Sequence, residues 1–429
     1  MPVKTPKIEE LKNSTATYDV VVIGGGPAGM MAAGRAGELG AKVLLIEKNT
    51  HLGKKLLITG GGRCNVTNAE YDTRTLLKKY GESDKFLFSP FSQFGVKETL
   101  ELFAKKGLEV KVENLKRVFP VSNKSESVLN TLKKYIKEGG VEVLLSSEVA
   151  SIITEGEKIK EITLKDKTKI KGSNFILSTG GLSRPETGST GDGFKWLSKI
   201  GHSVKTPTPS LVPIETKEAW SKKLQGTSLP NVKVSVFQNN TAQLVNKGKI
   251  LFTHFGLSGP LILNMSKDIG EMVKYGETII SLDLFPTLDH GSLDKKILKI
   301  FEENQNKKFK NALPDFLPTA VLNAVLEVGK FDKEVFAHSL NKDERKRFVY
   351  LLKDLRLTVV NLLGEEKAII TSGGVALTEI DFKTMKSKKY SNLFVVGDIL
   401  DIDRPSGGYS LQLCWTTGFI AGENASKNK

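Results

Sequence analysis

The chain has 429 residues, 39% of them hydrophobic and 26% charged, a balance typical of globular proteins rather than disordered or membrane-spanning ones. Its two cysteines, Cys64 and Cys414, exclude a disulfide scaffold and a four-cysteine zinc site. Lysine and arginine outnumber aspartate and glutamate by 63 to 48. The resulting formal net charge of +15 suits either a polyanionic partner or a generally lysine-rich protein.

The cellular location is predicted from what the sequence lacks. No apolar stretch approaches the ~20 residues of a membrane-spanning helix. The leader, residues 1–17, is polar and charged, without the apolar core of a signal peptide. We therefore expect a cytoplasmic protein without a membrane partner.

The first predicted elements form a strand–helix–strand unit. An apolar, β-branched run over residues 18–23 predicts a buried strand, a helical segment follows over residues 30–39, and residues 42–46 predict a second strand. The turn after the first strand reads GGGPAG, residues 24–29, and fits G-x-G-x-x-G. This order predicts a Rossmann-type α/β domain with a dinucleotide site.

The glycines of this turn have separate physical roles. Gly24 permits the tight turn, Gly26 lets the backbone approach a pyrophosphate, and Gly29 lets helix and strand pack closely. The helix N-terminus then offers N–H groups and a positive dipole to the phosphates. Glu47, about 20 residues further on, is placed to accept hydrogen bonds from both ribose hydroxyls. Because Glu47 would repel a 2′-phosphate, FAD and NAD are favoured over NADP.

Three downstream segments favour FAD. A glycine-rich stretch over residues 59–68 surrounds Cys64 and allows the backbone to lie against a flat ligand. A predicted strand over residues 175–177 runs into a Thr-Gly-Gly turn, where the chain returns beside the cofactor. Near the end, a buried strand finishes in Gly-Asp at residues 397–398, and a Gly-Gly pair at residues 407–408 opens a helix. We expect the N-terminus of that helix to face the flavin pyrimidine edge and stabilise negative charge on the reduced ring.

These motifs resemble the BaiN/RdsA family of FAD-dependent oxidoreductases over nearly the whole chain. The matching segments are residues 24–29, 59–65, 117–120, 180–193, 211–213, 251–260, 371–375 and 407–409. Two differences stand out: Asp398 replaces a usual glutamate, and residues 403–406 replace a loop that more often carries glycine. In flavoproteins of the glutathione-reductase type, an aspartate like Asp398 bonds the ribityl hydroxyls of FAD.

The motifs and the resemblance together predict the cofactor site and the domain organisation. We expect an α/β fold: a Rossmann-type FAD domain of glutathione-reductase type that begins with residues 1–205, with a β-rich domain (206–289) and a helical cap (290–356) inserted. Residues 357–429 are expected to start with a return strand, residues 357–360, that rejoins the β-rich part, and to supply the C-terminal part of the FAD domain. The inserted parts are expected to cover the flavin and set the substrate class. The predicted FAD-binding residues are Gly24, Gly26, Pro27, Ala28, Gly29, Glu47, Lys48, Gly61, Gly62, Arg63, Asn65, Ala150, Thr179, Gly180, Gly181, Gly397, Asp398, Gly407, Gly408 and Leu411.

Two residues are candidates for the chemistry. Cys64 follows Arg63, a cation that would stabilise its thiolate, and a thiol can supply the proton that C=C reduction requires. The alternative is a small buried residue that packs near the ring. His254 precedes a Gly-Pro turn and is expected either to bond substrate or donate a proton, or to order its loop. Arg184 and Arg404 are possible anion contacts.

The sequence also bears on binding of a metal, of NAD(P)H and of phosphate groups. The remaining histidines show no ligand-like grouping, so no metal is expected. The chain has no second G-x-G-x-x-G, and NAD(P)H is therefore predicted to visit the flavin only transiently as reductant. The basic runs of the helical part, residues 307–310 and 345–347, suit either a solvated helix face or phosphate contact.

The resemblance leaves three functions open, because family members are described as ribosomal RNA dihydrouridine synthases, bile-acid-pathway reductases and an amino-ketone oxidase. The first is reduction of the C5=C6 bond of a uridine in 23S ribosomal RNA, which the net charge favours. The second is a small-molecule flavoenzyme, either an enone reductase or an amine oxidase. The third is a flavin-loaded RNA-binding protein without catalytic activity.

Overall fold

The computed structural model describes residues 5–6, 17–313 and 316–427 of the chain. It contains two compact units: Met1–Pro209 with Ala368–Lys429, and Ser210–Lys367. Of the polar leader that bears on export, only residues 5, 6 and 17 are described.

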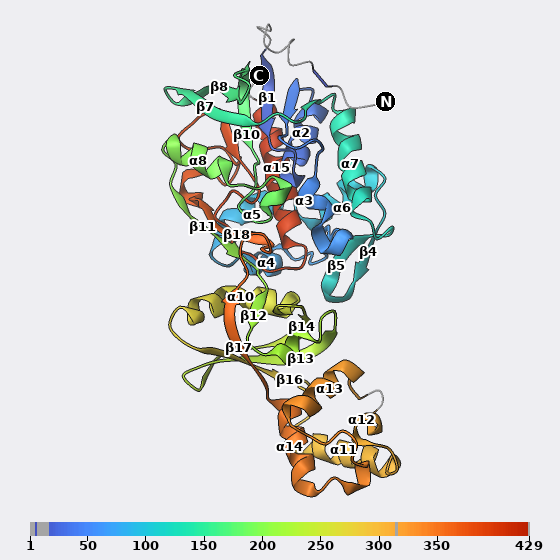
Figure 1. Ribbon diagram of the computed structural model, residues 1–429. Helices are drawn as coiled ribbons and strands as arrows, with labels where there is room; N and C mark the ends of the chain where they lie inside the picture. Colours follow the sequence, from blue (N-terminus) through green and yellow to red (C-terminus); the bar gives the residue numbers. More distant parts are fainter. Residues whose placement is uncertain (1–4, 7–16, 314–315, 428–429) are drawn as a thin grey trace. The chain divides into compact units, whose positions relative to one another are not determined.

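The first unit is built on a five-stranded parallel sheet (Figure 1). In sheet order its strands are β19 (Leu393–Val395), β10 (Gly172–Leu177), β1 (Tyr18–Ile23), β2 (Val43–Ile46) and β6 (Glu142–Leu144). The α/β Rossmann expectation is confirmed. Both faces of the sheet are buried, because alternate residues of β1 belong to different cores: Val20 and Val22 to one, Val21 and Ile23 to the other.

Helices cover the sheet, and two of them pack unusually closely. Helix α2 (Pro27–Glu38) lies against α15 (Tyr409–Lys427). A Cβ atom on Gly418 would lie 2.4 Å from the carbonyl oxygen of Ala28, and one on Gly422 would lie 2.3 Å from that of Ala32. Because glycine has no side chain, Gly418 and Gly422 allow α15 to pack directly against the backbone of α2.

Smaller elements complete the first unit. Its additional sheets are β7 (Val149–Glu155), β8 (Lys158–Leu164) and β9 (Lys169–Ile170); β3 (Thr67–Asn68), β5 (Arg117–Pro120) and β4 (Val110–Glu113); and β11 (Val204–Ser210) with β18 (Ile370–Val375). Its other α-helices among the described residues are α3 (Lys54–Leu57), α4 (Thr73–Leu77), α5 (Asp84–Gln93), α6 (Val96–Lys105), α7 (Ser125–Glu138) and α8 (Asp192–Lys199).

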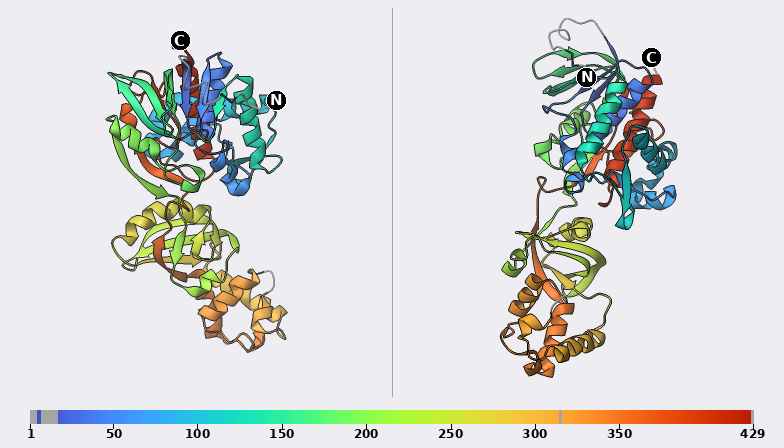
Figure 2. Two further views of the ribbon diagram at one scale, coloured as in Figure 1. Left: turned by 45° about the horizontal axis from the view of Figure 1, so that its top comes forward. Right: turned by 90° about the vertical axis from the view of Figure 1, so that its right-hand side faces the viewer.

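The second unit contains a closed six-stranded barrel and a group of helices (Figure 2). In order around the barrel the strands are β12 (Ile214–Thr216), β15 (Gly256–Ser258), β14 (Thr241–Phe252), β13 (Ser228–Gln238), β16 (Thr278–Asp283) and β17 (Leu355–Leu362). The helices are α9 (Ala219–Lys222), α10 (Pro260–Val273), α11 (His290–Glu303), α12 (Phe309–Ala312), α13 (Thr319–Val328) and α14 (Lys342–Lys353). An ion pair at 2.7 Å joins Lys353, the last residue of α14, to Asp283, the last residue of β16.

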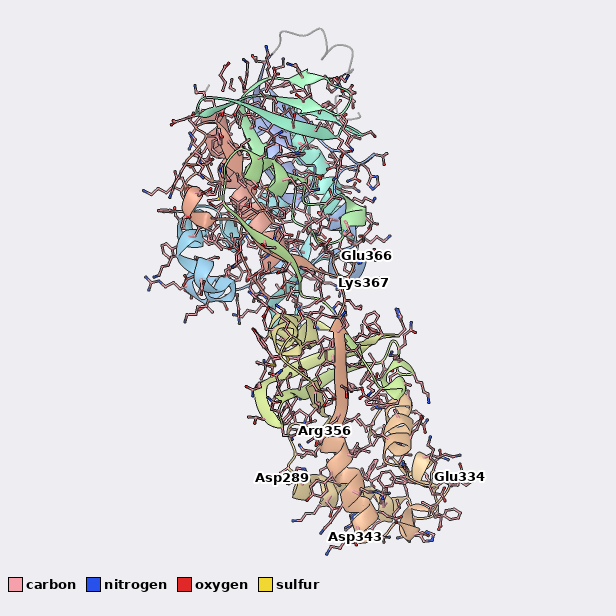
Figure 3. The ribbon with its side chains drawn as sticks, turned by 60° about the vertical axis from the view of Figure 1, so that its left-hand side comes forward. Asp289, Glu334, Asp343, Arg356, Glu366 and Lys367 are labelled. Atoms are coloured by element: carbon pink, nitrogen blue, oxygen red, sulfur yellow. The ribbon has the colours of Figure 1, made fainter. Side chains whose placement is uncertain are left out.

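Charge is distributed unevenly between the units. The segment Ser210–Lys367 contains 23 lysines and arginines and 19 acidic residues, so it contributes only +4 of the net +15. Part of its basic runs is also paired: Lys308 and Lys310 both bond Glu334, which is labelled in Figure 3, and lower the pKa of its carboxyl group to about 2. The remaining +11 belongs to the unit with the parallel sheet.

The described residues lack two features, a membrane-spanning helix and a cluster of metal-binding side chains. Across residues 5–6, 17–313 and 316–427, every helix is too short or too polar to cross a bilayer. The same part of the chain contains no cluster of three or more His, Cys, Asp or Glu side chains arranged to hold a metal ion.

Candidate cofactor site

The first unit contains a cavity with an empty volume of about 1200 Å³, which includes the solvent space at its open mouth. Its walls come from the segments that follow β1, β2, β10 and β19, together with α3 and the start of α15. In parallel α/β sheets, the carboxyl ends of the strands are where ligands bind. The cavity is therefore the candidate cofactor site.

The glycine turn forms one wall of the cavity. Gly24 has φ +107°, a conformation that favours glycine, and a Cβ atom on Gly29 would lie 1.9 Å from the Gly24 carbonyl oxygen. At Gly26, which precedes α2, a Cβ atom would meet nothing within 4 Å. Gly29 is thus required by the protein itself, whereas the space beside Gly26 is left for a ligand at the positive end of the helix dipole.

Glu47 and Lys48 line the cavity where β2 ends. The Glu47 carboxylate accepts from the backbone N–H of Gly25 at 2.7 Å and from the side chain of Asn49 at 2.7 Å, so it braces the glycine turn. Lys48 donates to Asp192 at 2.7 Å. Burial raises the pKa of Asp192, but the hydrogen bonds from Lys48 and the Thr190 hydroxyl outweigh it and leave the pKa lowered.

The glycine-rich loop after α3 is open to solvent. Gly60, Gly61 and Gly62 are exposed and have φ between +57° and +83°, and a Cβ atom on Gly61 or Gly62 would meet nothing within 4 Å. Of the residues from Thr59 to Asn65, only Thr59 lines the cavity. The side-chain amide oxygen Oδ1 of Asn65, beside this loop, is buried without a hydrogen-bond partner in the described part of the chain.

A cluster of buried charges lies at the β19 side of the cavity. The Arg404 guanidinium donates to the Asp398 carboxylate through Nη2, to the Ile402 carbonyl oxygen through Nη1 (2.6 Å) and to the Ser410 hydroxyl through Nε (3.1 Å). Lys55 Nζ lies 3.7 Å from Asp398 Oδ2. Asp398 is thus placed beside the cavity, and Arg404 and Lys55 both line it with Asp398.

The Cys64 thiol does not have the predicted environment. It is fully buried in the core, and this burial raises its pKa to about 12 despite a hydrogen bond involving Thr59 that lowers it. The Arg63 guanidinium stacks on the Phe119 ring at 4.1 Å and bonds Glu113 at 2.5 Å. The expectation that Arg63 stabilises a Cys64 thiolate is wrong, because φ +60° at Cys64 turns the thiol into the core while Arg63 stays outside.

The structure brings about half of the predicted site residues to the cavity. Those that line it are Gly24, Gly26, Pro27, Ala28, Glu47, Lys48, Thr179, Gly180, Asp398 and Leu411. Those that do not are Gly29, Gly61, Gly62, Arg63, Cys64, Asn65, Ala150, Gly181, Gly397, Gly407 and Gly408. His254 belongs to the second unit, where it is exposed on the turn between β14 and β15 and its ring contacts Phe255 edge-on at 4.8 Å.

Two glycines absent from the lining allow close packing next to the cavity. A Cβ atom on Gly397 would lie 3.0 Å from the Ala28 side chain, and one on Gly408 would lie 2.4 Å from the Thr67 backbone. Thr67 in turn donates to Gln412 of α15 at 2.6 Å. These glycines let the returning chain approach the glycine turn and β3.

Sequence reasoning missed part of the lining. The missed set includes Asn49, Lys55, Ser147, Val149, Asp192, Trp196, Ile369, Ile370 and Ser410. Lys55 had a usable signal, since a lysine within a short apolar segment must find a partner when that segment is buried. The others reach the cavity only through the tertiary fold.

The residues fit the predicted cofactor. The Gly26 side of the cavity leaves room for a diphosphate, and Glu47 lines the cavity where β2 ends, the place at which a ribose-binding acid is expected. The Thr179 hydroxyl is buried without a hydrogen-bond partner among the described residues, and Thr179 lines the cavity. An unsatisfied hydroxyl beside a cavity is typical of a site that a polar ligand completes.

Comparison with known proteins agrees with this geometry. Residues 18–424 match the family model described as "HI0933-like protein Rossmann domain". The 3-dehydro-bile acid delta(4,6)-reductase of Clostridium scindens is 27% identical over 95% of this chain and 98% of its own length. The ribosomal RNA dihydrouridine synthase of Haemophilus influenzae is 28% identical with the same two coverages.

Solved structures with this fold include steroid dehydrogenases. The 3-ketosteroid-delta4-(5alpha)-dehydrogenase of Rhodococcus jostii RHA1 aligns over the full length of both chains with a TM-score of 0.55 and 13% identity. The 3-ketosteroid delta1-dehydrogenase of Sterolibacterium denitrificans aligns over 97% of this chain and 100% of its own, with a TM-score of 0.55 and 14% identity. At these identities the likeness is one of fold.

Proposed function

The chain belongs to the HI0933-like family and is an FAD-dependent oxidoreductase; on that premise we propose that it reduces the C5=C6 bond of a uridine in 23S ribosomal RNA to dihydrouridine, with NAD(P)H as electron source. Near full-length similarity to two proteins named ribosomal RNA dihydrouridine synthase supports this. The main support for an RNA substrate over a small molecule is net charge: the unit with the cofactor cavity contributes +11 of the net +15. A net positive charge favours binding of a polyanionic RNA.

The residues of the cavity have defined tasks in this reaction. FAD, when bound, supplies the two-electron chemistry. We propose that the glycine turn holds its diphosphate at the N-terminus of α2, that Glu47 accepts from the ribose, and that Asp398 faces the ribityl chain. The lining by Leu56, Ile370 and Leu411 limits water at the reacting end.

Saturating the C5=C6 bond also requires one proton at C5. Two residues remain proposed donors. The Cys64 thiol keeps its proton at neutral pH, since its pKa is raised to about 12, but it is fully buried. The His254 side chain is exposed, so a substrate can contact it without a structural change in the second unit. We therefore propose His254 as the first donor to test and Cys64 as the second.

The second candidate function is reduction of a small-molecule enone. It is favoured by the bile acid reductase, which is as similar to this chain as the RNA-modifying relatives are. An amine oxidase that passes electrons to oxygen is a further small-molecule option, without a specific observation in its favour. A non-catalytic RNA-binding role does not fit a chain that belongs to an oxidoreductase family.

The test is mass-spectrometric mapping of dihydrouridine in 23S ribosomal RNA from a deletion strain. We expect one dihydrouridine to disappear, to return with the intact gene, and not to return with Gly26→Ala, which blocks the diphosphate position. An unchanged 23S pattern would exclude the RNA function. Purified protein that reduces a steroid enone but leaves the RNA unmodified would establish the second function instead.

The electron source is tested separately. We propose that NAD(P)H reduces the flavin and leaves before substrate enters, since the chain has no second G-x-G-x-x-G. Stopped-flow mixing with NADH or NADPH should bleach the flavin absorbance. If neither nicotinamide does so, the reductant is a different molecule.

A further inference from the structure

Arg404 is a buried cation in the wall of the FAD cavity, and its side chain is only 1% exposed. Burial lowers the pKa of a guanidinium, but the charge and hydrogen bond of Asp398 more than offset this, so the pKa of Arg404 is raised and the group stays protonated. It lies in the loop between β19 and α15.

The cluster around Arg404 has more positive than negative charge. Lys55 Nζ lies 3.7 Å from Asp398 and donates to the Ser183 hydroxyl at 2.5 Å. Two cations therefore share one carboxylate. Burial is the main reason that the pKa of Lys55 is lowered, and the nearby Arg404 charge lowers it further. Arg404 is fully buried and Lys55 is partly buried, and an excess of positive charge with little access to solvent is unfavourable unless a ligand supplies negative charge.

The other charged groups of the cavity do not balance this excess. Lys48 pairs with Asp192, and Glu148 pairs with Lys165 at 2.7 Å. Glu47 follows β2, which is three strand spacings, about 14 Å, from β19. The negative charge must then come from FAD, either from its diphosphate or from its ring after reduction.

Two features favour the ring. The diphosphate position beside Gly26 already has the positive end of the α2 dipole. Arg404 instead bonds Ser410, in the first turn of α15, whose N-terminus we expect at the flavin pyrimidine edge. Uptake of two electrons and one proton gives the ring one negative charge, and a cation beside it stabilises the reduced form more than the oxidised form.

We propose that Arg404, together with Lys55, holds the negative charge of the reduced flavin and so raises the reduction potential of FAD in this protein. Arg404 acts here as a positioning and tuning residue for the cofactor. The proposal requires bound FAD but no particular substrate, so loss of the ribosomal RNA function would leave it standing.

The experiment measures the flavin potential of the FAD-loaded protein by equilibration with a redox dye, and its sulfite affinity by bleaching of the flavin absorbance. Arg404→Gln should shift the equilibrium toward oxidised flavin about tenfold or more, which is about 30 mV or more for a two-electron couple. Sulfite, whose adduct also places negative charge on the ring, should bind about tenfold more weakly. Arg404→Lys should retain most of both properties.

Three further variants make the result decisive. Lys55→Met removes the second cation without altering the 403–406 loop and should shift both quantities in the same direction as Arg404→Gln. Asp398→Asn removes the carboxylate and should raise the potential. Arg35→Gln is the matched control, because Arg35 lies on α2 outside the cavity and pairs with Glu423 at 2.9 Å.

Two results would overturn the proposal. One is an unchanged potential in FAD-loaded Arg404→Gln or Lys55→Met. The other is weaker binding of oxidised FAD with an unchanged potential, which would assign the two cations to the diphosphate instead.

Discussion

Alkylation of the native protein tests the environment of Cys64 directly. Burial raises the pKa of the Cys64 thiol from an ordinary value of 9.0 to about 12. At about pH 8, well below both values, the thiolate population is then about 1000-fold smaller than for a free thiol, and the thiolate is the species that iodoacetamide attacks. Because the side chain is also fully buried, native Cys64 should react at least about 1000-fold more slowly than in guanidinium.

The assay is timed alkylation followed by mass spectrometry of the peptide that contains Cys64. The same chain in guanidinium supplies the reference rate, and Arg63→Gln should leave the native rate unchanged, since Arg63 bonds Glu113 rather than the thiol. Native labelling within about tenfold of the denatured rate would refute this reasoning. It would also restore Cys64 as an activated thiolate.

The remaining predictions concern the glycine turn, the barrel, the pH dependence of stability and the proton donor. Gly29→Ala should prevent stable folding, because its Cβ atom would lie 1.9 Å from a carbonyl oxygen, whereas Gly26→Ala should keep the apoprotein melting temperature and weaken FAD binding in a fluorescence titration. Lys353→Met leaves the Asp283 side chain, which is 12% exposed, without its ion-pair partner and should lower the free energy of unfolding in urea by about 3 kcal/mol. A decrease below about 0.5 kcal/mol would contradict a stabilising buried pair. Because the folded-state pKa of Cys64 is the higher one, its stabilising contribution is complete below about pH 9 and is lost as the pH rises toward 12, so Cys64→Ala should flatten the alkaline fall of the urea midpoint. His254→Ala should leave flavin reduction intact but slow substrate reduction; unaltered turnover would remove His254 from the mechanism.

The parallel sheet could be predicted from sequence because its signals are local. A fully buried parallel strand is a continuous apolar run, and the turn from β1 to α2 carries its glycines within six residues. The expected strand over residues 18–23 coincides with β1, Tyr18–Ile23. The barrel was harder to predict from sequence, because its closure depends on the pairing of β12 with β17, which are more than a hundred residues apart in the chain. Alternation of apolar residues identifies such strands but not their neighbours.

Cys64 shows why sequence adjacency is a weak guide to electrostatics. Arg63 and Cys64 are consecutive, yet a left-handed backbone at Cys64 places the thiol in the core and leaves the guanidinium over the Phe119 ring. Arg404 shows the opposite case. Both of its partners, Asp398 and Ser410, are only six residues away along the chain. The sequence did not show that the Arg404 guanidinium bonds them; the fold of this segment does. Composition predicted a cation-rich protein, but the backbone path decides which cations line the cavity.

The distribution of charge changes the argument for an RNA substrate. The net +15 was most easily assigned to the lysine-rich helical insertion, but the insertion contributes only +4, and Glu334 pairs with both Lys308 and Lys310 there. An electrostatic contribution to RNA binding must then come mainly from the cofactor-bearing unit, with its +11. Long-range attraction depends on net charge rather than on the number of lysines. The ion pairs of Lys308 and Lys310 with Glu334 reduce the positive charge that the inserted helices could offer to a phosphate backbone.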